Sequence, residues 1–217
     1  MISLGDSFGW PFRDGSWVSK VLLQGLILII PIIGQIALAG WILTSLDNVR
    51  SGRWELAPAG FHLGRGFQLF IVQLVYYVAI GIPAWILYGL GGMLAGQSSS
   101  GGSTALFGLG YLYQAVASLF LLFLGPSILV STYRGGISGG LNVGGVWAQA
   151  TANPTNSILA ALVFLVAGFI GYLGIVLCFI GVFFTSVYAG AVVAGAAAWF
   201  DQVTSGGEAP AAAGPTY

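Results

Sequence analysis

Charged residues are confined to a few short stretches of this chain, and three long blocks between them contain none. Six basic and six acidic side chains are distributed among 217 residues. The uncharged blocks cover residues 21–46, 66–133 and 135–200. At about 1.5 Å per helical residue, a hydrocarbon core of about 30 Å requires roughly 20 residues. Each block can therefore enter a membrane, and the second and third are long enough to cross it twice.

The composition points to lipid as the main solvent of the chain. Charged residues make up 6% of the sequence and hydrophobic residues 57%, whereas soluble domains carry about 25% charged residues. We therefore expect an integral membrane protein whose first partner is the lipid bilayer. The formal net charge is zero, which argues against a nucleic-acid partner because such binding requires a basic surface.

The second and third blocks each predict a transmembrane hairpin. The expected crossings lie at about 67–90, 109–131, 158–177 and 181–200, with a flexible linker at 91–104 and a helix start at Asn153-Pro154. The predicted fold is an all-α integral membrane helical bundle with four or five crossings. Its expected parts are an interfacial N-terminal segment (1–20), a membrane domain (21–203) and a disordered tail (204–217).

The first apolar segment, 21–46, allows two interpretations because Pro31, Gly34 and Gln35 interrupt it. Its length favours one tilted crossing, whereas a re-entrant hairpin around Pro31–Gly34 would place every charge on one side of the membrane. The arginines that follow this segment share one side in either case, and the positive-inside rule makes that side cytoplasmic. We therefore expect a multi-pass protein of the inner (cytoplasmic) membrane with a cytoplasmic C-terminus.

Three motifs resemble those of a bacterial and archaeal multi-pass membrane family known only as a domain of unknown function. Residues 10–20 match its aromatic-Pro-Phe-x-Asp-x-x-Trp-x-x-Lys opening, and residues 30–34 match Ile-Pro-Ile-x-Gly. Residues 174–181 match its Gly-x-x-x-Cys-x-Ile-Gly turn. The resemblance covers nearly the whole chain, and it implies no activity, cofactor or catalytic residue. The connector PAGFHLGRG is less acidic here than in that family.

His62 is the only histidine, and no second histidine or carboxylate lies at a ligand spacing from it. A nucleophile with its base, or a metal site, requires such a constellation, so we expect no enzymatic activity. One imidazole still suffices to bind a haem iron or the magnesium of a chlorin, which makes His62 a candidate pigment or haem ligand. The alternative is a histidine that hydrogen bonds to backbone or headgroups at the interface; the sequence identifies no cofactor.

The polar residues in the interior of the predicted membrane segments include Gln35, Gln73 and Gln114. Their amides either hydrogen bond between helices or form a polar path for a neutral solute. The predicted membrane cores contain no ionisable residue, which argues against ion-coupled transport, because such transport uses charged groups within the membrane.

The last predicted helix carries small residues at four-residue spacing: Ser186, Gly190, Ala194 and Ala198. Such a stripe allows close approach of another helix, either from the same subunit or from a neighbouring one. From these features we expect a non-catalytic accessory or scaffold subunit of a larger membrane complex or homo-oligomer. The alternatives are a transporter or channel for a neutral or lipidic solute, and a pigment- or haem-binding subunit that uses His62.

Overall fold

Helices are the only regular secondary structure among the residues that the structure, a computed structural model, describes: 2–96, 100–176 and 180–205. The elements are α1 (Asp6–Gly9), the 3₁₀ helix η1 (Trp10–Arg13), α2 (Trp17–Leu28), α3 (Ile33–Arg50), α4 (Leu63–Ala95), α5 (Ser100–Leu141), α6 (Val143–Ala152), α7 (Pro154–Leu173) and α8 (Gly181–Thr204). Four helices in this part of the chain are long and apolar enough to span a membrane: α4, α5 from Gly101, α7 and α8. The predicted all-α membrane bundle is confirmed. The tail predicted at 204–217 lies, from residue 206 on, outside the described residues.

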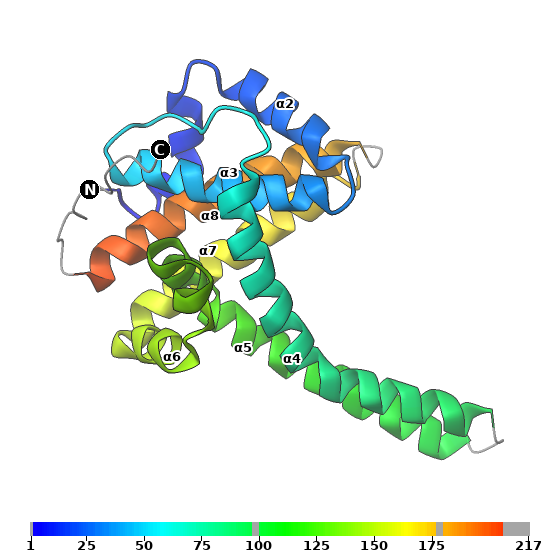
Figure 1. The fold of residues 1–217 in the computed structure, drawn as a ribbon. Helices are drawn as coiled ribbons and strands as arrows, with labels where there is room; N and C mark the ends of the chain where they lie inside the picture. The colour runs from blue at the N-terminus through cyan, green and yellow to red at the C-terminus, as the bar shows by residue number, and fades with distance from the viewer. Residues whose placement is uncertain (1, 97–99, 177–179, 206–217) are drawn as a thin grey trace.

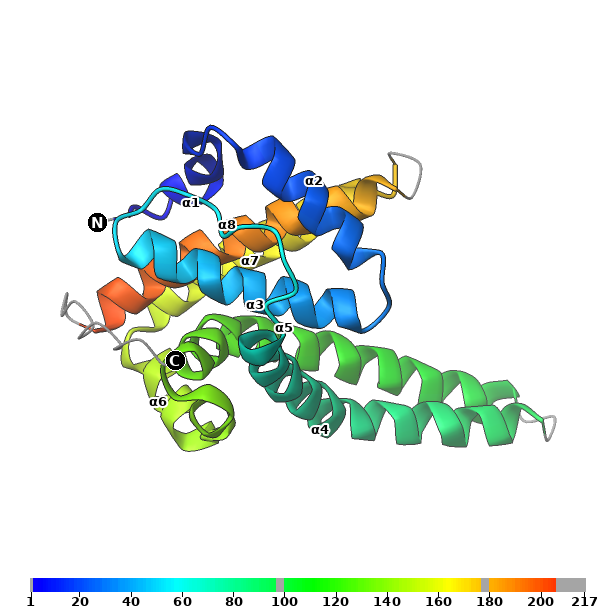
Figure 2. The ribbon, with the colours of Figure 1, turned by 45° about the horizontal axis from the view of Figure 1, so that its top comes forward.

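Helices α4 and α5 pair with each other and extend away from the other helices, as Figure 1 shows. We call their distal part, residues 78–95 and 100–120, the arm, and helices α1 to α3 and α6 to α8 with the remaining parts of α4 and α5 the body. The far end of the arm, the α2–α3 turn and the C-terminal end of α7 lie toward the same side of the molecule (Figure 2). The hairpins therefore point in a common general direction but diverge from one another.

The linker predicted at 91–104 is shorter than expected, because α4 continues to Ala95 and α5 begins at Ser100. Glycines on each helix make room for aromatic rings of the other. A Cβ added to Gly91 would lie 3.2 Å from the Phe107 ring, and one added to Gly110 would lie 2.5 Å from the Tyr88 ring. Because the two helices pack this closely, their pairing continues into a stretch whose composition is typical of a loop.

The first apolar segment reverses direction instead of forming one helix. Helix α2 ends at Leu28 and α3 begins at Ile33; at about 1.5 Å per residue, the twelve residues of α2 cover only about 18 Å. The Lys20 ammonium donates to the Leu56 carbonyl at 2.9 Å, so the start of α2 lies beside the segment that follows α3. The chain therefore enters and leaves this segment at the same end of the molecule, as in the re-entrant alternative.

The α3–α4 contact depends on two glycines at the point where the helix backbones meet. A Cβ added to Gly40 would lie 2.1 Å from the His62 carbonyl oxygen, and one added to Gly66 would lie 1.9 Å from the Ile36 carbonyl oxygen. Atoms cannot approach this closely, so only glycine fits at either position. This contact fixes where α4 leaves the body.

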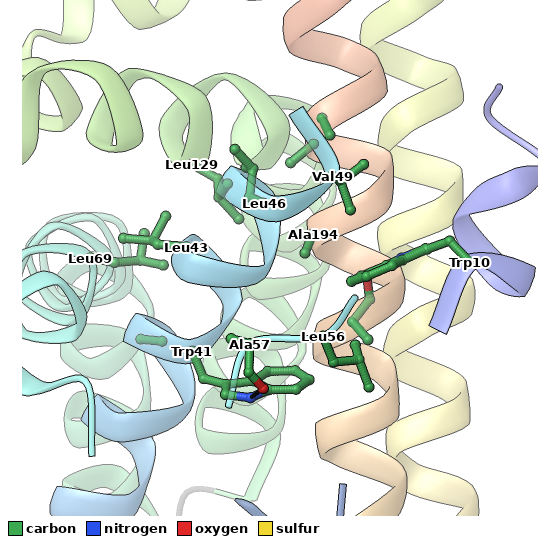
Figure 3. Close-up of a cluster of buried hydrophobic side chains, with 14 of the residues drawn as sticks. Trp10, Trp41, Leu43, Leu46, Val49, Leu56, Ala57, Leu69, Leu129 and Ala194 are labelled. Atoms are coloured by element: carbon green, nitrogen blue, oxygen red, sulfur yellow. Dashed lines mark hydrogen bonds between the residues drawn. The ribbon is translucent and has the colours of Figure 1, made fainter. Parts of the chain in front are cut away.

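The N-terminal segment, predicted to lie at the membrane interface, packs largely against α8. Trp10 is fully buried, and its indole N–H donates to the Ala191 carbonyl at 3.0 Å. The Tyr188 hydroxyl donates to the Phe8 carbonyl at 2.8 Å. Figure 3 shows Trp10 in the buried cluster beside Ala194, with side chains from α3, α4 and α5. Since α8 is rich in small residues, a tryptophan can fill the space along its surface.

Helix α5 ends in a bend that positions α6 and α7. Gly136 has a non-helical backbone (φ 59°, ψ −147°) inside α5, a region that glycine adopts easily. Asn142 and Asn153 then cap α6 and α7, and Pro154 occupies the first turn of α7. The predicted helix start at Asn153-Pro154 is confirmed, and the polar stretch before it is the short helix α6.

Candidate functional site

A cavity of about 530 Å³ lies where the α4–α5 hairpin diverges from the body. Five helices contribute to its wall: α3, α4, α5, α7 and α8. The lining is mostly apolar and includes Leu38, Ile42, Leu69, Tyr77, Leu121, Phe164 and Val193. An apolar cavity with a few polar groups is the usual form of a site for a small molecule.

Three polar side chains reach this cavity from three different helices: Gln35 from α3, Gln73 from α4 and Ser186 from α8. Within the described part of the chain, none of the three has a hydrogen-bond partner. Two tyrosines also line the cavity, and the hydroxyl of one of them, Tyr76, donates to the Gly140 carbonyl at 3.1 Å. Leaving an amide unpaired in an apolar environment costs roughly 1–3 kcal/mol. The cavity therefore offers unsatisfied hydrogen-bonding groups to whatever occupies it.

A second hollow of about 480 Å³ adjoins the cavity along α7 and α8. The two share Ala167, Gly168, Ser186 and Ala189 as lining residues. A Cβ added to Gly168 would meet nothing within 4 Å, so the space beside this glycine is open. Together the two hollows form an elongated apolar groove. Gln35 and Gln73 line only the first hollow.

Of the predicted polar interior residues, the structure brings Gln35 and Gln73 together but leaves Gln114 apart. Gln114 lies on the arm, does not line the cavity, and donates to the Ser118 hydroxyl one turn away at 3.4 Å. A polar path that includes both Gln73 and Gln114 therefore draws no support from this cavity. The sequence does not reveal that α5 diverges from α3 at the level of Gln114.

The small-residue stripe of α8 is used within the chain. Ala194 and Ala198 are fully buried, and a Cβ added to Gly190 would lie 3.1 Å from the Ile42 side chain of α3. Ser186 and Gly190 line the cavity. Ala194, Ala198 and Gly190 thus pack within the chain, whereas Ser186 is only partly buried.

His62 lies at the start of α4, outside the described cavities. Its Nε2 lies 2.8 Å from the Pro58 carbonyl oxygen, which makes Nε2 the protonated nitrogen because a carbonyl only accepts. Its backbone is left-handed (φ 39°) and packs against Gly40. A metal cannot bind Nε2 while this bond is in place, and the histidine holds the loop before α4.

Ion pairs tie four helices together at one end of the body. Arg50 and Arg134 both pair with Asp201, whose carboxylate is fully buried, and Arg65 pairs with Asp47. The Tyr133 hydroxyl also donates to Asp47 at 2.5 Å. We call these five ionic residues the charged end. The sequence predicted that the arginines share one side, but it did not indicate that Asp201 is buried among them.

Asp14 forms a second, smaller polar centre between the N-terminal segment and the loop after α3. Burial raises the pKa of its carboxyl, but hydrogen bonds from Lys20 and Ser16 and from the backbone N–H of Leu56 lower it to about 2 overall. The carboxyl accepts from Lys20 Nζ at 2.7 Å and from the Leu56 N–H at 3.0 Å. Asp14 therefore stays ionised and fastens the loop to the start of α2.

The four apolar spans and the hairpins that they form define a multi-pass helical membrane protein. The described residues contain no group of three or more His, Cys, Asp or Glu side chains placed to hold a metal ion. Residues 23–199 match the family model described as "Protein of unknown function (DUF4013)", and the chain belongs to this family. No curated protein and no solved structure matches the chain.

Proposed function

We propose that this protein binds a neutral, largely apolar molecule from the membrane in the cavity between its two spanning hairpins. The observation that carries the proposal is the set of three unpaired polar groups, Gln35, Gln73 and Ser186, in an otherwise apolar wall. An amide supplies both donors and an acceptor without charge. The fitting ligand is therefore a lipid-like molecule with hydroxyl or carbonyl groups.

The shape of the site supports an elongated ligand. The adjoining hollow along α7 and α8 extends the apolar wall beyond the polar groups. A ligand with a neutral headgroup would place that group between Gln35 and Gln73 and its hydrocarbon chain along Gly168 and Gly171. This arrangement corresponds to the lipidic-solute alternative that the sequence left open.

The scaffold hypothesis draws less support from the geometry. It relied on the α8 stripe as a contact face, and Ala194 and Ala198 are buried in the chain itself. Ligand binding also requires no catalytic group, so we propose a non-enzymatic role. We further propose that the charged end faces the cytoplasm, since Arg50, Arg65 and Arg134 gather there and the positive-inside rule favours that side.

The test uses the full chain in nanodiscs of phosphatidylcholine with a diacylglycerol that carries a photoreactive group in its acyl chain. Cross-linked residues and yields are read by mass spectrometry, with unlabelled diacylglycerol as competitor. We expect cross-links at Phe164 and Leu121 in the wild type. Gln73→Leu should weaken binding about three- to tenfold, the equivalent of one lost hydrogen bond, and Gly168→Leu should block the groove.

Matched controls separate the site from general effects on the membrane domain. Gln114→Leu makes the same chemical change outside the cavity. Gly108→Leu is the counterpart of Gly168→Leu, because a Cβ added to Gly108 also meets nothing within 4 Å. Both controls should bind like the wild type. Cross-links spread evenly over the arm, or an equal loss in Gln114→Leu, would contradict the proposal.

A further inference from the structure

A separate cavity of about 680 Å³ lies at the charged end, away from the glutamine-lined site. It is formed by the last turns of α5, by α6, by the residue that caps α7, and by the end of α8. Its lining is largely polar or glycine and includes Ser131, Arg134, Gly139, Asn142, Gln149, Asn153 and Thr204. The two cavities share no lining residue, so their ligands are independent.

Two asparagines present only hydrogen-bond donors to this cavity. The Asn142 side-chain oxygen accepts from the Gly145 N–H at 3.0 Å, and the Asn153 side-chain oxygen accepts from the Asn156 N–H at 3.4 Å. These bonds identify which amide atom is oxygen, so the free atom of each amide is the NH₂ group. Neither NH₂ group has a partner among the residues that the structure describes.

Arg134 adds positive charge to the same lining. Its Nη2 pairs with Asp201, and its side chain remains 42% exposed. Asp201 also pairs with Arg50, so two guanidinium groups share one carboxylate and an excess charge of +1 remains. Over the described residues, no Asp or Glu lines this cavity to cancel it.

The other polar groups of the lining are already engaged with one another. The Ser131 hydroxyl donates to Gln149 Oε1 at 3.0 Å, and Gln149 Nε2 donates to the Thr204 hydroxyl at 3.4 Å. The free groups are thus the donors of Asn142, Asn153 and Arg134. A set of donors with net positive charge fits an acceptor-rich anion.

We infer that this cavity binds a phosphate group. A phosphate can come from a phospholipid headgroup or from a soluble phosphate ester, and both present the same oxygens to the three donors. The lining also includes one large apolar side chain, Val203, which is 40% exposed. Anionic lipid headgroups bind basic pockets between membrane helices in this way.

The decisive variant is the double substitution Asn142→Asp/Asn153→Asp in the full chain. Asp retains the side-chain oxygen that caps each helix, but it replaces the donor group with a negative one. Ser19→Asp is the matched control, because Ser19 lies in the first turn of α2, is exposed and does not line the cavity. Each variant is placed in nanodiscs of phosphatidylcholine with one-tenth phosphatidylglycerol, and bound lipids are counted by native mass spectrometry.

The wild type and Ser19→Asp should retain phosphatidylglycerol at least tenfold over its share of the bilayer, and the double variant should lose this enrichment. Added inorganic phosphate then separates the two sources. If it displaces the lipid, the site also takes soluble phosphate; if it does not, the site requires the lipid headgroup. Asn142→Ser/Asn153→Ser, which keeps a cap without adding charge, should show an intermediate loss of about threefold.

Three results would overturn the inference: enrichment that survives in the double Asp variant, an equal loss in Ser19→Asp, or a wild type that shows no enrichment and binds no phosphate. None of them bears on the glutamine-lined cavity, which shares no residue with this one. Conversely, loss of diacylglycerol cross-linking in Gln73→Leu with phosphatidylglycerol enrichment intact would separate the two sites in a single protein.

Discussion

Helix α8 and the arm differ in what covers them, although both are apolar. In the most apolar part of α8, 56% of residues are buried within the chain, compared with 28% for α4. The covered face of α8 consists of small residues such as Ala191 and Ala194, both fully buried. The arm instead exposes large side chains, among them Met93 (70%) and Leu119 (66%). In a membrane, small residues mark the faces that protein covers, and large apolar residues mark the faces that lipid covers.

The same contrast holds for polar interactions. The body is closed at one end by ion pairs around Asp201 and Asp47. The sequence from 66 to 133, which includes the whole arm, contains no charged residue. Within the described residues, the arm is held by side-chain packing and by a few hydrogen bonds such as that from the Tyr113 hydroxyl to the Ile80 carbonyl at 2.9 Å. The body should therefore respond sharply to substitutions that the arm tolerates.

The largest expected effect comes from Asp201→Asn. This change leaves Arg50, whose side chain is only 7% exposed, without its counter-ion. Breaking a buried ion pair typically costs about 3–5 kcal/mol. The free energy of unfolding in mild detergent, measured by denaturant titration, should fall by about this amount. Arg53→Gln, which alters an exposed arginine bonded to Asn48, is the control and should change it by less than about 1 kcal/mol.

The second prediction compares two glycines in the same helix. Gly66→Ala would place a Cβ 1.9 Å from the Ile36 carbonyl oxygen, whereas a Cβ at Gly89 meets nothing within 4 Å. Overpacking costs about 1–3 kcal/mol or more, and a backbone contact this short places Gly66→Ala at the upper end. Gly89→Ala should stabilise the arm slightly, by up to about 1 kcal/mol, because Ala favours the helix. Similar effects of the two substitutions on the unfolding midpoint would remove the distinction between body and arm.

The sequence predicted the two hairpins and the helix start at Asn153, because charges, apolar length and capping are local properties. It also identified Gln35 and Gln73 as candidate interior groups. It grouped Gln114 with them, because only the path of the helices shows that the arm diverges from α3. The linker at 91–104 was predicted too long for a similar reason: Gly91 accommodates Phe107, a partner sixteen positions later.

The N-terminal segment also makes a contact that the sequence did not predict. It was predicted to lie at the membrane interface, but Trp10 is buried against Gly195, where an added Cβ would lie 2.7 Å from the indole nitrogen. That pairing joins residues far apart in the chain, and no local pattern predicts it. The sequence feature that accompanies this contact is a glycine of α8 outside the four-residue stripe, Gly195. A glycine leaves space beside the helix, and a large side chain such as Trp10 can fill that space.

The smallest expected effect concerns Asp14, which fastens the loop after α3 to the body. Its pKa is lowered from the ordinary 3.8 to about 2. The ionised carboxylate of Asp14 therefore stabilises the folded protein. This stabilisation is fully present above the pKa that Asp14 has in the unfolded chain. It is lost as the pH falls through the lower pKa that Asp14 has in the folded protein.

At pH 6, Asp14→Asn should lower the free energy of unfolding by about 1.5–3 kcal/mol, typical of hydrogen bonds to a charged group. The difference between wild type and variant should shrink between pH 4 and pH 2, because protonation removes the same charge. A difference that stayed constant over this range would mean that the Asp14 hydrogen bonds do not depend on its charge. If the distance between spin labels on the two helices of the arm changed over the same range, the loop and the arm would be coupled, and the boundary between body and arm would have to be drawn elsewhere.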